Sequence, residues 1–258
     1  MAADEGLTAQ FAELRRAIRK EDYERALKLT TDLMGQCPDD EDLVKCKCVA
    51  LIHLEDYAAA LKVAKAGNGL EFEQAYCLYK QKAFDRALTV VQGSSEADSE
   101  RMRHVEGQCL YALQQAEEAV DVFQKLHDES SDPSPELSAN ACAAYVVSGR
   151  AREGIENLDL ADGAGDASSS SSSNYEMSYN LACALLACRN YGKAEATLRT
   201  AEGQCRRMLM EEAYSPEAIE GEVAVVQVPP PPSPAPSLRG FLPSFLSCFL
   251  SFFALRTG

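Results

Sequence analysis

The segment Asp56-Tyr57-Ala58-Ala59-Ala60-Leu61 is followed further along the chain by Phe84-Asp85-Arg86-Ala87-Leu88. In both segments an aromatic residue stands three positions before an alanine, and apolar residues at helical spacing lie on both sides. One such match arises by chance in any alanine-rich helix. Its recurrence predicts a repeated structural unit.

The same pattern recurs along the whole chain. The small residue of each repeat falls, in order, at Ala26, Ala60, Ala87, Ala119, Gly154 and Ala194. The spacings, by subtraction, are 34, 27, 32, 35 and 40. A period of about 34 built from two short helices is typical of the tetratricopeptide repeat (TPR). We therefore predict an all-α fold, a right-handed TPR superhelical solenoid of six antiparallel helix pairs.

The two recurring residue types have distinct roles in such a fold. A small residue lets the two helices of a pair approach closely, and the aromatic residue fills the gap to the next pair. We expect the first helix to begin at about Thr8 and its partner to begin at Asp22. The glycines at 67 and 69 end the second pair early, which explains the shortest of the spacings. A further helix, the start of a seventh repeat, is expected after Ser215, without a partner helix.

Composition changes divide the chain into four parts. Residues 1–160 hold the first five repeats, which we expect to bind the partner, and residues 161–174 form a Gly/Ser-rich loop predicted to be flexible. Residues 175–228 hold repeat six and the start of a seventh. Residues 229–258 are Pro-rich and then Phe/Leu-rich. This last part is either a membrane tail anchor or a non-native or disordered ending. We favour the second reading, because a solenoid should end in a capping helix with a polar outer face.

The charge and the cysteines exclude several classes of protein. A formal net charge of -15 opposes general attraction to nucleic-acid phosphates. The ten cysteines show no spacing typical of a zinc site, so we predict free thiols in a reducing compartment. The acidic amino terminus lacks the apolar core of a signal peptide. These features predict a cytoplasmic protein.

No catalytic pattern is found in the sequence. The three histidines, His53, His104 and His127, fall in different repeats, with no nucleophile or carboxylate motif nearby. No Gly-rich phosphate loop occurs. We therefore predict that the chain is not an enzyme, with no catalytic residues, no cofactor and no metal site.

The first helices of stacked repeats line a concave groove. Its predicted partner-binding residues are Phe11, Arg15, Ile18, Val49, Ile52, Phe72, Tyr76, Tyr79, Lys80 and Tyr111, and further inward positions are Lys45, His53, His104 and Gln108. Aromatic residues bordered by positive charge suit a peptide with apolar anchors. The alternative is that Phe72, Tyr76 and Tyr79 belong simply to the core, since the first helix of a repeat serves both faces.

Three runs of sequence resemble a known family. They are YNLACALL (Tyr179–Leu186), AEGQCRRML (Ala201–Leu209) and FEQAYCLY (Phe72–Tyr79). All three are similar to the amino-terminal repeat region of the family of the signal recognition particle's 72-kilodalton subunit. The resemblance covers roughly positions 8–227. It implies a scaffold subunit of that particle, which binds the carboxy-terminal segment of the 68-kilodalton subunit in targeting secretory proteins to the endoplasmic reticulum.

The resemblance also sets expectations about RNA. The Lys-rich carboxy-terminal region through which the family contacts the particle (7S) RNA is missing here, and the chain ends inside the seventh repeat. We therefore expect contact with that RNA only indirectly or weakly. We also expect no stable membrane insertion, and a cytoplasmic location with association to the endoplasmic reticulum surface through the particle.

Two other functions remain as alternatives. One is a generic TPR adaptor or co-chaperone that binds a peptide of another partner. Repeats that grip a carboxylate-ended peptide carry a lysine followed four residues later by asparagine, whereas Lys45 is followed by Val49. The other alternative is a tail-anchored membrane receptor, which depends only on the Phe-rich ending.

Overall fold

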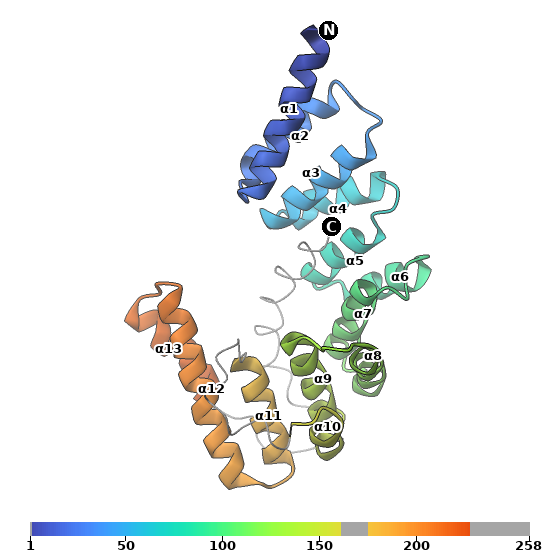
Figure 1. Cartoon of the computed structure of the whole chain (residues 1–258). Helices are drawn as coiled ribbons and strands as arrows, with labels where there is room; N and C mark the ends of the chain where they lie inside the picture. Colours follow the sequence, from blue (N-terminus) through green and yellow to red (C-terminus); the bar gives the residue numbers. More distant parts are fainter. Residues whose placement is uncertain (1, 161–174, 228–258) are drawn as a thin grey trace. The chain divides into compact units, whose positions relative to one another are not determined.

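A computed structural model of the chain describes residues 2–160 and 175–227, and in these residues it forms thirteen α-helices and no β-strand (Figure 1). The contacts divide the chain into two compact units. The described part of the N-terminal unit is residues 2–109. The described part of the C-terminal unit is residues 110–160 and 175–227. The predicted all-α class is confirmed.

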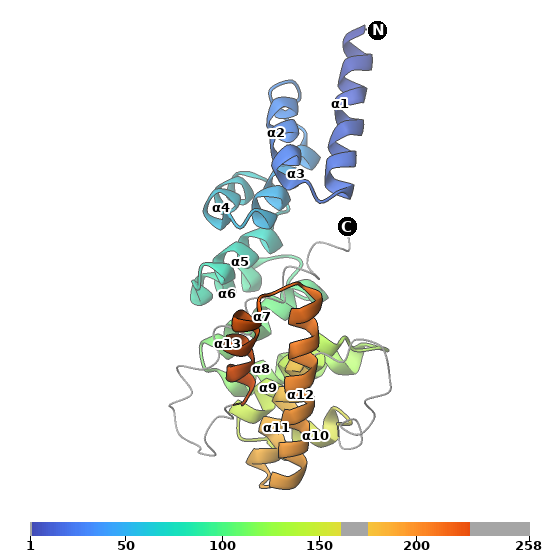
Figure 2. The same cartoon turned by 90° about the vertical axis from the view of Figure 1, so that its left-hand side faces the viewer.

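The N-terminal unit consists of helices that pack in chain order. They are α1 (Ala2–Arg19), α2 (Tyr23–Met34), α3 (Glu41–His53), α4 (Tyr57–Ala66), α5 (Glu71–Lys80), α6 (Phe84–Gly93) and most of α7 (Glu100–Ala112). From α1 to α6 each helix contacts the next, and α3 also contacts α5 (Figures 1 and 2). The first helices of the second and third repeats are therefore neighbours, as stacking of pairs requires.

The C-terminal unit continues the same pattern. It holds the end of α7 together with α8 (Ala116–Glu129), α9 (Pro135–Val147), α10 (Ala151–Asn157), α11 (Tyr175–Ala187), α12 (Tyr191–Glu211) and α13 (Pro216–Gln227). Helix α9 contacts α8, α10 and α11, and α12 contacts α11 and α13. Helix α10, with 7 residues, is the shortest of the described helices, and α12, with 21, is the longest.

The turn inside each of the six pairs has the same backbone geometry. One residue has a positive φ of 57° to 79°, at Glu21, Glu55, Lys82, Gln114, Gly149 and Arg189. The next N–H donates back across the turn. Asp22 N–H, for example, donates to the Ala17 carbonyl at 3.0 Å, which closes the end of the first helix. By subtraction these six residues are 34, 27, 32, 35 and 40 apart, as are the small residues in the sequence, so the predicted repeat register is confirmed.

The predicted small residues lie where the helices of a pair meet. Ala26, Ala60, Ala87, Ala119, Gly154 and Ala194 are all buried. In several pairs the last residue of the turn is the N-cap of the second helix. The carboxylates of Asp22 and Asp56 accept from the N–H groups of Arg25 and Ala59, at 3.2 and 3.0 Å. The turn and the cap together explain why each pair forms locally.

Two expectations about helix ends are wrong. Helix α1 begins at Ala2, so Thr8 lies inside it and is not its N-cap. The helix expected after Ser215, α13, does have a partner, because α12 is long enough to supply one (Figure 2). Ile219, Val223 and Val226 of α13 form a buried cluster with Ala201, Cys205 and Leu209 of α12. The C-terminal half of α12 therefore carries an apolar face that packs against the apolar face of α13 and buries it.

Parts of the sequence-based division are not tested. The predicted loop at 161–174 and the predicted tail at 229–258 lie outside the described residues, so the four-part division stays a prediction. No helix in the described ranges combines the length and the apolar content that crossing a lipid bilayer requires.

Candidate partner-binding site

Helix α5 carries a row of aromatic side chains. Phe72 and Tyr76 lie four residues apart, hence on one face of the helix, and their rings stack with centroids 6.1 Å apart and an interplanar angle of 20°. Tyr79 lies beyond them and contacts Phe84 of α6 with a centroid separation of 5.7 Å. All three residues of α5 are buried, and Tyr76 is only 1% exposed. These rings therefore form part of the core of the N-terminal unit.

Two cations lie against this aromatic row. The Lys80 ammonium is 5.8 Å from the ring centroids of both Tyr76 and Tyr57, and these two rings meet edge to face at 6.4 Å. The Arg101 guanidinium carbon lies 3.8 Å from the ring centroid of Phe72. Cations over aromatic faces are favourable, by roughly 0.5–1 kcal/mol at exposed sites. Helices α5 and α7 thus place positive charge against the aromatic row, and α4 adds the ring of Tyr57 beside Lys80.

The predicted residues on α1 and α3 do not join this row. Phe11 is half-buried and packs against a cluster that includes Leu14 and Leu33. Arg15 and Ile18 are exposed. On α3, Ile52 is buried and Val49 is half-buried. The aromatic contact in this region is instead between His53 and Tyr23, whose rings stack at 3.7 Å.

Tyr111 belongs to the C-terminal unit. It is buried, and burial is the main cause that raises its pKa, with Cys183 and Tyr179 as lesser causes. The ten predicted residues are therefore distributed over both compact units. Whether they form one continuous groove stays a prediction.

Two residues that contact the aromatic row, Tyr57 and Arg101, are not among the ten predicted partner-binding residues. Tyr57 is the aromatic residue of the second repeat, and it was assigned only a packing role between pairs. Arg101 is the second residue of α7 and has no motif around it. The signal for Tyr57 was available in the repeat pattern, whereas no sequence signal places a cation over Phe72.

A buried amide lies on α7 near the end of the N-terminal unit. Gln108 is 2% exposed, and among the described residues its Oε1 has no hydrogen-bond partner. A buried acceptor without a donor costs free energy, on the order of 1–3 kcal/mol. Such groups need an explanation, and one is a donor from a bound partner.

The thiols and acidic groups form no metal centre in the part of the chain that the structure describes. Nine described cysteines are free, and six of them are buried. Burial raises the pKa of Cys48, Cys77, Cys109 and Cys183 to about 12. These thiols pack as small apolar side chains.

Comparison with known protein families identifies the repeats. Residues 19–146 match SRP_TPR_like, a family described as a TPR-like repeat. The signal recognition particle subunit SRP72 of Homo sapiens is 30% identical over 227 residues, which cover 84% of this chain and 32% of that protein. The SRP72 proteins of Dictyostelium discoideum and Caenorhabditis elegans are 24% and 28% identical over 84% and 86% of this chain. The chain thus spans about a third of the length of these relatives.

Comparison with solved structures supports the same fold. A tetratricopeptide repeat protein from Parabacteroides merdae has a TM-score of 0.58 and 12% sequence identity, and the match covers 86% of this chain and 84% of that chain. At this identity the likeness shows the fold alone. All of these matches are to repeat or scaffold proteins and not to a known enzyme family. The chain belongs to the SRP72 family of signal recognition particle subunits and matches its amino-terminal tetratricopeptide-repeat region.

Proposed function

We propose that this chain is a non-catalytic scaffold subunit of the signal recognition particle that binds the 68-kilodalton subunit through its TPR groove. In this role it serves the co-translational targeting of secretory proteins to the endoplasmic reticulum. The observation that carries the proposal is the similarity to SRP72 proteins over 84% of the chain. The proposed location is that of the particle, in the cytoplasm and at the endoplasmic reticulum surface.

The aromatic row of α5 supports a peptide-binding role. Interface energy is concentrated in a few aromatic and arginine side chains, and here Phe72 lies under Arg101 while Tyr76 lies beside Lys80. Because the three rings of α5 are buried, the groups left to a partner segment are the half-buried Lys80 and Arg101, which acidic residues of that segment would complement. The Gln108 oxygen would then accept a hydrogen bond from an N–H of the bound segment.

Burial determines which variants can test this proposal. Tyr76→Ala would remove a ring from the core, with a cost of roughly 3–5 kcal/mol, so loss of binding would not be separable from loss of folding. Ile18 is better suited because it is 37% exposed on α1. Leu54 is equally exposed, at 37%, lies in the same compact unit and is not among the predicted groove residues, so it provides a matched control.

The experiment measures binding of the purified 68-kilodalton subunit to the full chain. We expect submicromolar binding that Ile18→Asp combined with Arg15→Glu weakens by about tenfold or more, equivalent to roughly 1.4 kcal/mol. Leu54→Asp should leave the affinity unchanged. Equal effects of both changes would remove α1 from the site. Absence of binding by the unmodified chain would contradict the proposal. Recovery of chaperones with the chain from cytoplasmic extract would then favour a co-chaperone adaptor.

We further propose that this chain binds the particle RNA only weakly, or only indirectly through another subunit. The chain has 40 acidic and 25 basic residues, and phosphate affinity depends on uncompensated cations. The charge of Arg206 is engaged by Glu202 and Glu220. A filter-binding titration with the 7S RNA should therefore show weak binding, and submicromolar affinity with a steep salt dependence would contradict this part of the proposal.

A further inference from the structure

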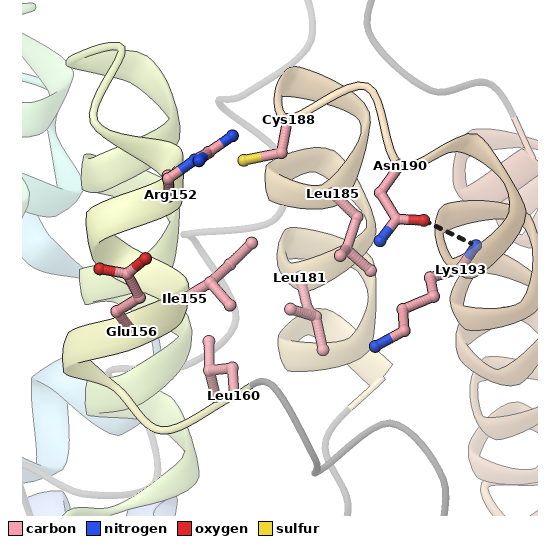
Figure 3. Close-up of a pocket in the computed structure, with 9 residues that line it drawn as sticks. All are labelled: Arg152, Ile155, Glu156, Leu160, Leu181, Leu185, Cys188, Asn190 and Lys193. Atoms are coloured by element: carbon pink, nitrogen blue, oxygen red, sulfur yellow. Dashed lines mark hydrogen bonds between the residues drawn. The ribbon is translucent and has the colours of Figure 1, made fainter.

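A separate pocket lies in the C-terminal unit between α10, α11 and the start of α12 (Figure 3). Its volume is about 290 Å³. Figure 3 shows Ile155 of α10 pointing toward α11, with Leu181 and Leu185 on α11, the latter on the side toward α12, and Leu160 below them. None of the predicted groove residues lines this pocket, so it is distinct from the aromatic row of α5.

The pocket follows from the length of α10. With seven residues, α10 is the shortest second helix of any described pair, and it covers less of α11 than a longer helix would. Leu181 and Leu185 belong to the same apolar cluster as Ala194, with Ile155, Leu160 and Leu186 packed against it. The short helix therefore leaves a gap above an apolar floor.

The chemistry of the lining selects an apolar occupant. The four floor side chains are Ile155, Leu160, Leu181 and Leu185, which offer no hydrogen-bond donor or acceptor. The side-chain oxygen of Asn190 is used to cap α12, accepting from the Lys193 N–H at 3.4 Å (Figure 3). The volume of about 290 Å³ lies just below the range of roughly 300–1,000 Å³ for ligand sites. It therefore suits one or two aliphatic side chains better than a cofactor.

The charged residues at the rim of the pocket determine which charges can flank the aliphatic side chain of the occupant. Arg152 and Glu156 lie on α10 and Lys193 lies on α12 across the pocket, so two cations and one carboxylate line the rim in a chain of net charge -15. Within the described ranges, Arg152 and Lys193 form no ion pair. The neighbouring Arg150 pairs with Glu117 and Glu153, and Arg199 of α12 pairs with Glu195. The rim thus has positive charge that the described structure does not compensate.

We propose that this pocket is a second docking site, which takes a leucine or isoleucine side chain from an acidic segment of a partner protein. The aliphatic side chain occupies the floor, and carboxylates flanking it pair with Arg152 and Lys193. This arrangement satisfies both the apolar floor and the positive rim. The site does not depend on the 68-kilodalton subunit occupying the groove.

The test uses the full chain with labelled isoleucine and leucine methyl groups, observed by NMR. The probe is a short synthetic peptide that alternates leucine with aspartate, and the comparison peptide carries lysine in place of aspartate. We expect the acidic peptide to shift the methyl signals of Ile155, Leu181 and Leu185 and the basic peptide to leave them in place. Equal shifts with both peptides, or no shift with the acidic one, would overturn the proposal. Protection of the same methyl groups by self-association without peptide would also overturn it, in favour of a second copy as the occupant.

Charge reversal on the rim gives a second readout that does not disturb the core. Arg152→Glu and Lys193→Glu should each lower the affinity for the acidic peptide by about two- to fivefold. Glu156→Lys should raise that affinity by a similar factor. Lys125→Glu is the matched control, because Lys125 is exposed on α8 of the same unit and does not line the pocket. The proposal fails if the rim variants behave like this control, or if Glu156→Lys weakens binding.

Discussion

Gly154 of α10 packs directly against Tyr145 of α9. A Cβ atom placed on Gly154 would lie 2.6 Å from the Cβ and 2.7 Å from the Cγ of Tyr145. The tyrosine ring cannot easily move away, because its hydroxyl donates to Gln124 Oε1 at 2.7 Å and accepts from Asn157 Nδ2 at 2.9 Å. The position that makes the fifth repeat depart from the alanine pattern is therefore one where α9 and α10 lie too close for a Cβ atom.

This contact predicts the effect of adding one methyl group. Gly154→Ala should lower the free energy of unfolding by roughly 1–3 kcal/mol through overpacking. Gly203→Ala provides the control, since Gly203 lies inside α12 with no atom within 4 Å of an added Cβ. That change should raise stability by about 0.5–1 kcal/mol. Chemical denaturation of both variants checks the prediction, and a neutral or stabilising Gly154→Ala would contradict it.

The buried alanines of the other repeats predict a similar sensitivity. Ala60 of α4 has no exposed surface, so Ala60→Leu should overpack the α3–α4 pair and cost roughly 1–3 kcal/mol. Ala58 lies two residues earlier on the same helix and is exposed, so Ala58→Leu should be nearly neutral. Thermal unfolding followed by circular dichroism compares the two. Equal melting temperatures would mean that the repeat register is misplaced.

The cysteines should separate into slow and fast classes toward alkylation. Burial raises the pKa of Cys48, Cys77 and Cys109 to about 12, so at pH 8 almost none of each thiol is ionised. Cys37 and Cys188 are only half-buried and should react first with iodoacetamide. Mass spectrometry of partly modified protein gives the order. Rapid modification of Cys48 or Cys77 in the folded protein would contradict the described packing.

The ion pair between α12 and α13 predicts a pH dependence. Arg206 Nη1 donates to Glu220 Oε1 at 2.5 Å, and this hydrogen bond lowers the pKa of Glu220 from its ordinary value of 4.5. A carboxyl group with a lowered folded-state pKa stabilises the fold above its unfolded pKa. That contribution is lost as the pH falls from about 4.5 through the lowered value. The protection of the α13 amides, expressed relative to the intrinsic exchange rate at each pH, should therefore fall as the solution is acidified through this range.

A matched pair of variants isolates this contribution. Glu220→Gln should make exchange of α13 faster at neutral pH and reduce its response to acid. Glu217→Gln changes an exposed carboxylate on the same helix with no ion pair among the described residues, and it should leave both unchanged. Because Glu220 is largely exposed, the effect is expected to be local and small. An unaltered acid response in Glu220→Gln would assign the pH dependence to other groups.

The sequence by itself determined the repeat architecture, because the features that encode it are local. The small residue and the cap at Asp22 or Asp56 each act within one helical pair, and the aromatic before the small residue contacts the next pair along the chain. The spacings of the small residues were therefore reproduced by the positive-φ turns from Glu21 to Arg189. Family membership was also available from contiguous runs such as Tyr179–Leu186.

Only the tertiary structure decided which side chains are exposed and which helices find partners. Tyr76 and Ile18 looked alike as inward positions, yet one is buried and the other exposed, because burial depends on neighbouring helices distant in sequence. Helix α13 looked unpaired until the length of α12 placed Cys205 and Leu209 against it. The cation over Phe72 and the gap left by the short α10 also arise between helices, and no local pattern encodes such contacts.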